Sequence, residues 1–326
     1  MIQAPRFWQD KNSRLAKILN PVGKIYAFVV EKRLKGTRPY QAKMPVLCVG
    51  NLSVGGVGKT PVCLALGKFL RQKEKTFYYL NHGYKAKQQS VLVDMAVHTA
   101  LDVGDEALLL ASDAPTIVDS ARARGAQLAE NLGTDFLIMD DGFQNPSLVK
   151  TFSFVVVDGT LGFGNERVMP AGPLREPVLK GLKRADALVL VGKDTWGVAD
   201  YLKKHNIDLP LLTGHFEPDL KTIEELKNKP QVGAFAGIGH PEKFFKMLQE
   251  NGITLKECRS FPDHYFYTRF DIDGLKKEFP DLTWVTTSKD WVKIPSEMCQ
   301  NIVQVQGQFE FDDPEKLNEL LGDIVS

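Results

Sequence analysis

The sequence has no long apolar run, few cysteines and almost no net charge. No run approaches the roughly 18 to 20 apolar residues of a membrane-spanning helix, and the first residues lack the apolar core of a signal peptide. The four cysteines lie too far apart for a CxxC motif and are too few for a disulfide scaffold, which fits a reducing cytoplasm. With 41 basic and 40 acidic residues the net charge is +1, which argues against broad nucleic-acid binding through phosphate neutralisation. We therefore expect no nucleic-acid partner, and no feature predicts a protein partner.

The stretch at 46–61, VLCVGNLSVGGVGKTP, predicts a phosphate-binding loop. A strand, a glycine-rich loop and a helix start aim several backbone N–H groups and the positive end of a helix dipole at one point. Lys59 is expected to reach the β- and γ-phosphates of a nucleotide, and the Thr60 hydroxyl to hold Mg²⁺. Ser53 stands where the usual motif has glycine, so the plain pattern fails at its first position. The predicted nucleotide-binding residues of this loop are Ser53, Val54, Gly55, Gly56, Val57, Gly58, Lys59 and Thr60.

Two acidic motifs follow the phosphate loop. Residues 136–139 are an apolar strand of the buried type that ends in Asp140 and Asp141. Ligands bind beyond the carboxyl ends of such parallel strands, so both aspartates are expected near the metal of the nucleotide. Asp105 and Glu106 open a further apolar helix. From the residues alone, these two acids either belong to a site or only complement the helix dipole.

A long polar loop at 159–176 separates two further apolar strands. Loops of this length inside a compact domain are usually functional. Its last two residues, Arg175 and Glu176, either recognise the phosphate and hydroxyls of a substrate or form a solvated pair, and the sequence leaves both interpretations open.

Residues 1–43 interleave aromatic and aliphatic residues with lysine and arginine. Amphipathic helices of this composition lie in a bilayer interface, with their basic side chains on anionic head groups. A helix packed on its own domain shows the same 3.6-residue apolar stripe, so the residues alone favour neither interpretation. Pro21 and Gly23 predict a division of this segment into two helices.

Strands and helices alternate from residue 46 to about 208, and a smaller unit of the same kind follows. Strand-like segments at 209–216 and 301–311 flank the smaller unit and are predicted to pair as a ribbon between the domains. The predicted fold is α/β, with a P-loop NTPase-type parallel sheet flanked by helices and a second, smaller α/β domain joined by a two-stranded linker. The predicted divisions are 1–43 as a part of the first domain, 44–208 as the P-loop domain, 229–300 as the smaller domain, and 209–228 with 301–326 as linker strands and C-terminal segment.

Taken together, these motifs resemble those of the tetraacyldisaccharide 4′-kinases of lipid A synthesis, a family of P-loop kinases. The likeness covers most of the chain. The phosphate loop of this family begins with Ser or Thr where Ser53 stands, so the departure noted above favours the family. The resemblance rests on VGNLSVGGVGKTP at 49–61, DVGDEALLLA at 102–111, MDDGFQ at 139–144, MPAGPLRE at 169–176, FAGIGHPEKFF at 235–245, FPDHY at 261–265 and TTSKD at 286–290.

The resemblance implies Mg²⁺-dependent transfer of the γ-phosphoryl group of ATP to the 4′-hydroxyl of tetraacyldisaccharide 1-phosphate, giving lipid IVA. It implies that Asp105 is the general base, that His264 of the second domain orients it or tunes its pKa, and that the domains close over the site. Lys59 and Asp141 complete the catalytic candidates, and Arg122 matches a family arginine near the phosphates. The implied metal shell is Thr60, Asp140 and Glu106, and the implied substrate residues are Glu106, Gln144, Arg175 and Glu176.

Members of this family act on a lipid whose acyl chains stay in the bilayer. The resemblance therefore implies that residues 1–43 dock a peripheral or monotopic protein on the cytoplasmic face of the inner membrane. The sequence departs from the family at three positions: His82 replaces a usual Arg, His240 a usual Asn, and Tyr265 a frequent second His. At His82, the exchange of an always-charged guanidinium for a titratable imidazole could change a phosphate or substrate contact.

Two other kinds of P-loop protein are the alternatives. One is a GTPase or ATPase switch that transfers phosphate only to water. A GTPase requires an NKxD motif, but VGKD at 191–194 places Asp194 directly after Lys193, and NKPQ at 228–231 lacks the aspartate. The other is a different P-loop small-molecule kinase, which would not need a basic, aromatic N-terminal segment.

Overall fold

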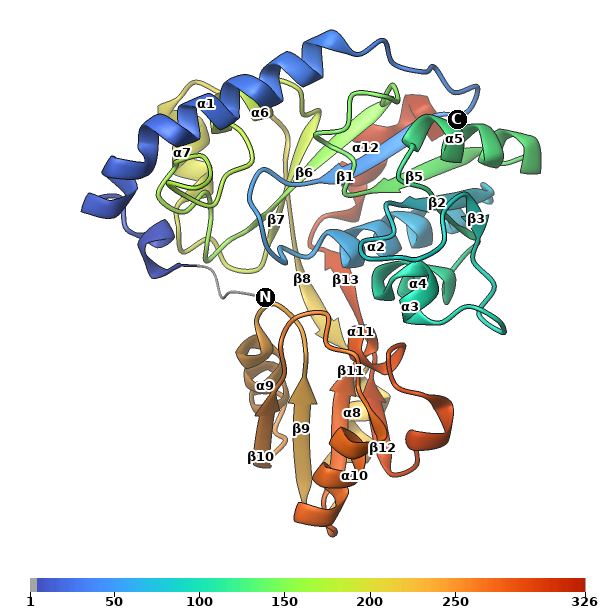
Figure 1. Ribbon diagram of the computed structural model, residues 1–326. Helices are drawn as coiled ribbons and strands as arrows, with labels where there is room; N and C mark the ends of the chain where they lie inside the picture. The colour runs from blue at the N-terminus through green and yellow to red at the C-terminus, as the bar shows by residue number, and fades with distance from the viewer. Residues whose placement is uncertain (1–4, 326) are drawn as a thin grey trace.

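The computed structural model describes residues 5–325, so residues 1–4 and 326 of the predicted terminal segments lie outside the described residues. Two β-sheets, one above the other in Figure 1, organise the described chain. The larger has nine strands in the order β13-β8-β7-β6-β1-β5-β2-β4-β3, and the smaller has four in the order β10-β9-β11-β12. Helices flank both sheets, so the predicted α/β fold with a second, smaller domain is confirmed.

The larger domain has a mostly parallel sheet with a buried centre. Every residue of β1, β5 and β6 is buried, because helices cover both faces of the parallel strands. Its strands are β1 (Val46–Gly50), β2 (Phe77–Asn81), β3 (Val91–Leu92), β4 (Thr116–Val118), β5 (Phe136–Asp140), β6 (Phe152–Asp158), β7 (Ala187–Val191), β8 (Leu211–Pro218) and β13 (Gly307–Phe311). Its helices are η1 (Arg6–Gln9), α1 (Arg14–Gly36), α2 (Lys59–Gln72), α3 (Ala100–Val103), α4 (Asp105–Ala111), α5 (Arg122–Leu132), α6 (Val178–Leu182), α7 (Val198–Lys204) and α12 (Pro314–Val325).

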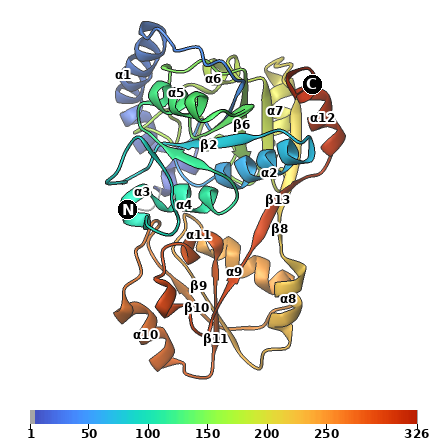
Figure 2. The ribbon, with the colours of Figure 1, turned by 90° about the vertical axis from the view of Figure 1, so that its right-hand side faces the viewer.

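Parallel pairing places the carboxyl ends of the central strands at one edge of this sheet. β1 pairs in parallel with both β5 and β6, and β2 pairs in parallel with β5. The phosphate loop leaves β1 at this edge, and Asp140 is the last residue of β5. Figure 2 shows the smaller domain lying below this edge, next to α4 and α2.

The helix α1 runs across the outside of the larger domain (Figure 1). It continues through Pro21, so the predicted division into two helices is wrong. Its buried side carries small residues, and a Cβ atom on Gly23 would lie 2.6 Å from the carbonyl oxygen of Val168. Gly23 therefore permits close packing of α1 and does not break it. No helix among residues 5–325 combines the length and the apolar character needed to cross a bilayer.

The smaller domain is a parallel four-stranded sheet with its own apolar core. β9 pairs in parallel with β10 and β11, and β11 pairs in parallel with β12. The core includes Trp284, which is 1% exposed. The elements of this domain are α8 (Leu220–Lys227), β9 (Val232–Ala236), α9 (Pro241–Glu250), β10 (Leu255–Ser260), α10 (Arg269–Glu278), β11 (Thr283–Thr287), α11 (Ser288–Trp291), η2 (Ser296–Met298) and β12 (Ile302–Val305).

The two domains are joined by the ribbon of β8 and β13, which pair as predicted, and the structure shows that the pairing is antiparallel. The prediction of one strand at 301–311 is wrong, however. This stretch forms β12 in the smaller sheet and β13 in the larger one, with Gln306 between them. The alternation of apolar and polar residues continues across Gln306, so the pattern contains no sign that the chain changes sheets there.

Candidate active site

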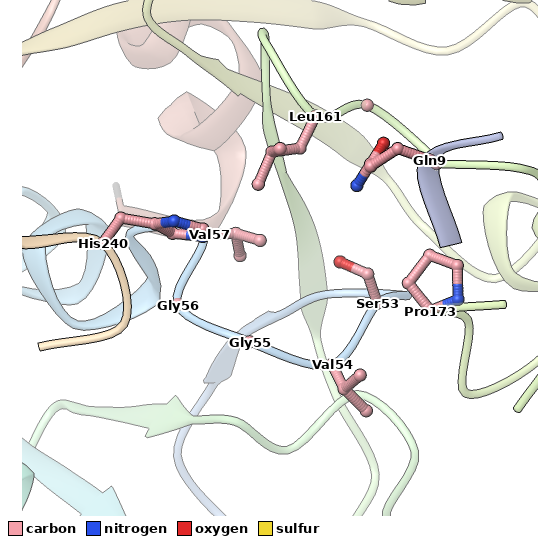
Figure 3. A pocket seen from close by; sticks show the side chains of 11 residues that line it. Gln9, Ser53, Val54, Gly55, Gly56, Val57, Leu161, Pro173 and His240 are labelled. Carbon is pink, nitrogen blue, oxygen red and sulfur yellow. The ribbon is translucent and has the colours of Figure 1, made fainter. Parts of the chain in front are cut away.

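The phosphate loop joins the end of β1 to the start of α2. Gly55 has a φ of +111° and Gly58, the residue before the helix, has a φ of +94°, a backbone conformation that side chains with a Cβ rarely adopt. The backbone N–H of Val54 donates to the carbonyl of Pro173 at 2.8 Å, so the long polar loop braces the phosphate loop. Figure 3 shows a pocket beside the loop, to which His240 of the smaller domain and Gln9 of η1 also contribute.

Thr60 and Asp140 meet beneath the phosphate loop. The Thr60 hydroxyl donates to Oδ2 of Asp140 at 3.1 Å, and the Asn81 amide donates to the same oxygen at 3.2 Å. Asp140 is fully buried, and its Oδ1 has no hydrogen-bond partner among the described groups. Burial, reinforced by the charge of Glu106, raises the pKa of Asp140 to about 6. A buried carboxylate oxygen that lacks a partner next to a P-loop hydroxyl fits a divalent cation.

Asp141 is held by two cations. Its carboxylate accepts a two-pronged hydrogen bond from Arg175, at 3.0 and 3.2 Å, and Lys59 Nζ lies 3.8 Å from Oδ2. Burial opposes ionisation, but the charges of Lys59 and Arg175 outweigh it and keep the pKa of Asp141 below its usual value. Asp141 thus links the phosphate loop to the long polar loop.

The candidate substrate residues of this region form one chain of contacts. The Gln144 amide donates to Glu176 Oε1 at 3.0 Å, and its oxygen accepts from Arg175 at 3.4 Å. Glu176 is buried and accepts two hydrogen bonds of 2.6 Å from Arg184, a residue that sequence analysis did not identify. These contacts hold Gln144, Arg175 and Glu176 together, and their roles toward a substrate stay predictions.

Arg122 is almost entirely enclosed, at 1% exposed. Its guanidinium donates to the carbonyl of Asp140 at 2.8 Å and to that of Asp141 at 3.4 Å. It therefore fixes the backbone at the end of β5. The predicted contact between Arg122 and a nucleotide phosphate stays a prediction, and these carbonyl contacts give the residue a structural role that sequence analysis missed.

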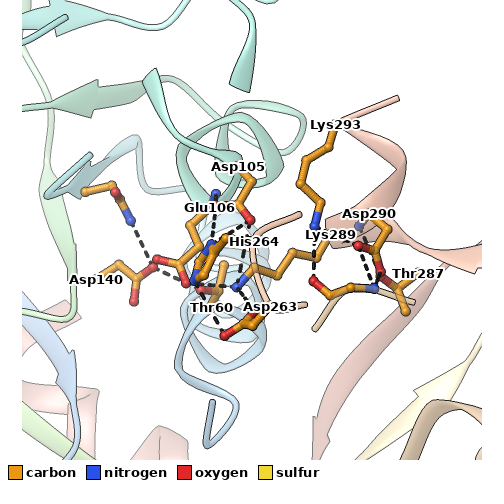
Figure 4. Close-up of polar contacts among 12 residues, drawn as sticks. Thr60, Asp105, Glu106, Asp140, Asp263, His264, Thr287, Lys289, Asp290 and Lys293 are labelled. Atoms are coloured by element: carbon orange, nitrogen blue, oxygen red, sulfur yellow. Dashed lines mark hydrogen bonds and ion pairs between the residues drawn. The ribbon is translucent and has the colours of Figure 1, made fainter. Parts of the chain in front are cut away.

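Asp105 and His264 meet across the two domains (Figure 4). Asp105 is the first residue of α4 and is 4% exposed, whereas His264 follows β10 of the smaller domain and has a φ of +58°. The Nδ1 atom of His264 lies 3.0 Å from Oδ1 and 2.9 Å from Oδ2 of Asp105. Burial alone would raise the pKa of Asp105, but the hydrogen bond from His264 and the charge of Lys289 lower it to about 2.

A lysine of the smaller domain completes this cluster. Lys289 Nζ lies 3.2 Å from Glu106 Oε1, 4.0 Å from Asp105 Oδ2 and 3.9 Å from Asp263 Oδ1. Sequence analysis quoted the motifs FPDHY and TTSKD but assigned no role to Asp263 or Lys289. The signal available was the concentration of polar and charged residues in two short segments, FPDHY at 261–265 and TTSKD at 286–290.

A second ion pair bridges the domains on the other side of the phosphate loop. Lys243 of α9 pairs with Asp158, the last residue of β6, and Lys243 Nζ also lies 3.4 Å from the Thr160 hydroxyl. Asp158 is 5% exposed, and it also accepts from the backbone of Thr160 at 2.9 Å. Both flanks of the phosphate loop are thus bridged by a charged contact between the domains.

Two of the three positions that depart from the resembled family, His240 and Tyr265, have local hydrogen-bond partners. His240 Nδ1 lies 3.1 Å from Glu242 Oε1, and the Tyr265 hydroxyl donates to Asp271 at 3.0 Å.

Asp194, the aspartate of VGKD at 191–194, accepts from three backbone N–H groups at 197–199, at 2.8 to 3.0 Å, and so caps α7. Its engagement in this cap argues against a role in guanine recognition.

Comparisons with known proteins agree over almost the whole chain. Residues 15–326 match the family described as tetraacyldisaccharide-1-P 4′-kinase. A tetraacyldisaccharide 4′-kinase from Paramagnetospirillum magneticum is 43% identical over 326 residues, covering 99% of each chain. Another, from Rhodospirillum centenum, is 41% identical, covering 100% of this chain and 97% of the relative. The crystal structure of LpxK from Aquifex aeolicus in complex with ATP is similar with a TM-score of 0.76 and 29% identity, over 96% of this chain and 100% of that one.

Proposed function

The chain belongs to the tetraacyldisaccharide-1-P 4′-kinase family, and on this basis we propose how its residues carry out the transfer. The protein is an ATP-binding kinase of lipid A biosynthesis that phosphorylates the 4′-hydroxyl of tetraacyldisaccharide 1-phosphate. The observation that supports the assignment of roles is the contact between Asp105 and His264, at 2.9 and 3.0 Å across the domain boundary. It gives a P-loop protein an oriented carboxylate for the proton of an acceptor hydroxyl.

The proposed proton acceptor is Asp105. As the 4′-oxygen forms its bond to the γ-phosphorus, the bond from that phosphorus to the β–γ bridging oxygen breaks and ADP keeps the electron pair. The hydroxyl proton passes to the Asp105 carboxylate. A carboxylate with a pKa of about 2 is a weak base, which suits a loose transition state in which the hydroxyl loses its proton late. His264 holds this carboxylate in place.

The proposed phosphate and metal ligands lie at the start of α2 and the end of β5. Lys59 would neutralise charge on the β- and γ-phosphates, with the N–H groups of the loop around it. Thr60 and Asp140 would hold Mg²⁺, with Glu106 nearby, because Asp140 is buried with one oxygen lacking a partner. When bound, Mg²⁺ would offset the charge of the phosphate oxygens. Asp141, fixed by Arg175, would position Lys59.

The proposed site of action is the cytoplasmic face of the inner membrane. Helix α1 turns large apolar side chains outward, among them Ile18 at 73%, Ile25 at 66% and Phe28 at 66% exposed. Lysine and arginine flank them along the same helix. An exposed apolar stripe with basic neighbours suits the interface of an anionic bilayer, where the acyl chains of the substrate are held.

The assignment of function is tested by direct transfer of label. The protein is incubated with γ-labelled ATP and tetraacyldisaccharide 1-phosphate in detergent, beside Lys59→Ala and Asp105→Ala. We expect labelled lipid from the wild type and almost none from either variant. Absence of labelled lipid from the wild type would reject the kinase. If Asp105→Ala kept near-normal turnover while Lys59→Ala lost it, the general base would be elsewhere and the kinase would stand.

A further inference from the structure

Two neighbouring residues of α11 point to opposite sides of the domain boundary. Lys289 reaches out to the carboxylates of the larger domain, whereas Asp290 is completely buried inside the smaller domain. Both belong to the motif TTSKD at 286–290, which neither the nucleotide nor the proposed chemistry explains. Figure 4 shows Lys289 extending toward Asp105 and His264, and Asp290 on the other side, beside Thr287 and Lys293.

Lys289 is the cation between three carboxylates that come from both domains. Glu106 and Asp105 belong to α4, and Asp263 precedes His264 in the smaller domain. Like charges at these separations repel, and partial burial weakens the screening by water. Approach of Asp263 to the acidic start of α4 would therefore be unfavourable without the Lys289 ammonium. Its side chain is 23% exposed, so its replacement removes no fully buried side chain from the core.

Asp290 fixes the loop that follows β9. Its carboxylate accepts from the backbone N–H of Gly237 at 3.0 and 3.1 Å and from the Tyr267 hydroxyl at 3.0 Å. Lys293 pairs with it at 2.7 Å and donates to the carbonyl of Gly237 at 3.1 Å. Asp290 thus binds the backbone N–H of Gly237, and Lys293 binds its carbonyl.

This fixed loop leads directly to His264. The same Gly237 carbonyl accepts the backbone N–H of His264 at 3.2 Å. A Cβ atom on residue 237 would lie 3.0 Å from the Tyr267 hydroxyl and 3.2 Å from Asp290 Oδ1, so the packing around this residue is tight. The path from Asp290 through Gly237 to His264 consists of consecutive hydrogen bonds, and His264 has a left-handed backbone that needs such support.

We propose that the TTSKD motif is the positioning element of the smaller domain for this kinase: Lys289 neutralises the carboxylates that face each other when the domains close, and Asp290 with Lys293 orients His264 toward Asp105. The proposal rests on the proposed function, because it assigns these residues to the same transfer. In this proposal neither Lys289 nor Asp290 contacts the reacting atoms. Their effect is on the closed arrangement and on the direction of the imidazole.

The role of Lys289 is tested with Lys289→Gln, which removes the charge, and with Lys289→Arg, which keeps it. We expect kcat to fall at least ten-fold in Lys289→Gln and to recover to within three-fold of the wild type in Lys289→Arg, since only the charge is needed. Energy transfer between dyes on exposed Cys258 and on a cysteine placed at Lys73 should report fewer closed molecules in Lys289→Gln. Lys246→Gln, on the exposed face of α9, is the matched control.

The test of Asp290 measures the hydrogen bond of the His264 imidazole directly. The wild type should show a downfield proton resonance for the Nδ1–H of His264, identified by its loss in His264→Gln. Asp290→Asn should weaken or shift this resonance and lower kcat at least ten-fold while the KM for ATP changes less than three-fold. Because Asp290→Asn could unfold the domain, Gly237→Ala, which presses on the same carboxylate, is measured beside it with circular dichroism.

The outcomes separate this proposal from the assignment of function. If the wild type labels lipid and Lys59→Ala does not, the kinase stands. If, in addition, Lys289→Gln keeps its kcat and its closed fraction, and folded Gly237→Ala keeps the His264 resonance, the positioning role is overturned. If the wild type labels no lipid but the resonance responds as expected, the function fails and the structural coupling of Asp290 to His264 remains.

Discussion

The Nδ1 atom of His264 contacts both carboxylate oxygens of Asp105, at 2.9 and 3.0 Å, although the two residues are 159 positions apart in the chain. An ionised carboxylate can only accept hydrogen bonds, so the proton lies on Nδ1 and points at Asp105. The contact joins the two domains, because Asp105 belongs to α4 and His264 follows β10. The orientation of the proposed base therefore depends on how the smaller domain sits against the larger one.

Replacing either member of this pair should lower kcat while nucleotide affinity is kept. We expect Asp105→Asn and His264→Gln each to lose about 100-fold or more in kcat, the usual worth of positioned acid–base catalysis. The double variant should be no slower than the slower single variant, because the two residues act as one unit. Steady-state kinetics of lipid labelling measures this, and losses that multiply would contradict it.

The sequence predicted the parts of the site that follow from strand ends. Apolar runs of the parallel type place the phosphate loop and Asp140 at one sheet edge, and the contact of Thr60 with Asp140 confirms that they meet. The meeting of Asp105 with His264 came from the family resemblance, since no local pattern relates residues that lie in different domains. Their roles in catalysis stay predictions.

Other features depend on tertiary packing that a linear pattern does not contain. Pro21 was expected to break α1, but at that place the helix continues, with Gly23 packed against Val168. The expected contact of Arg122 with a phosphate stays a prediction, whereas its hydrogen bond to the carbonyl of Asp140 at the end of β5 depends on burial that the motif does not reveal. Lys289 received no role, because its partners Asp105 and Glu106 lie in the other domain and no local pattern relates them to it. Its three carboxylates are visible only in the folded structure.

Removal of the Asp140 carboxylate should weaken Mg²⁺ use. In Asp140→Asn we expect the Mg²⁺ concentration for half-maximal activity to rise about 10-fold or more, because a metal ligand loses its charge. Chelation of divalent cations should stop labelling by the wild type. A titration of activity with Mg²⁺ measures the effect, with exposed Asp208→Asn as the control. An unchanged Mg²⁺ requirement in Asp140→Asn would place the metal elsewhere.

Charges placed on the outward face of α1 should release the protein from membranes. Ile18→Glu with Phe28→Glu adds two acids to a stripe that is exposed in the structure, so folding should be preserved. Flotation with vesicles that contain anionic phospholipid should show a much smaller bound fraction, while activity in detergent changes little. Leu132→Glu, at an exposed position of α5, serves as control. Equal flotation of the double variant and the wild type would contradict membrane docking through α1.

The ion pair between Lys243 and Asp158 should favour the closed arrangement. Lys243→Met keeps most of the side-chain stem and removes the charge, so we expect the closed fraction to fall several-fold, in keeping with about 1 kcal/mol for a pair whose lysine is half exposed. The effect should shrink as salt is added. Energy transfer between the domains measures it, with Lys246→Met as the matched control on the same helix. If the closed fraction is the same in Lys243→Met as in the wild type and does not change with salt, the ion pair does not stabilise the closed arrangement.

The ribbon that joins the domains should weaken at alkaline pH. On β8, His215 Nε2 lies 2.9 Å from Glu217 and Nδ1 lies 2.9 Å from Asp312. Hydrogen bonds to Glu217 and then to Asp312 raise the pKa of His215 above its usual value of 6.5. The protonated ring is thus favoured in the folded state. Its stabilisation is complete below pH 6.5 and is lost as the pH rises through the raised pKa.

His215→Gln should remove this part of the pH dependence. We expect the urea midpoint of the wild type to fall between about pH 6 and pH 9, and that of His215→Gln to fall less, because glutamine does not titrate. His98→Gln, whose ring contacts the backbone N–H of Asp94, is a control outside the ribbon. The effect should be small, since the His215 side chain is 50% exposed and water screens its partners. Parallel pH profiles for the wild type and His215→Gln would show that this charge does not support the ribbon.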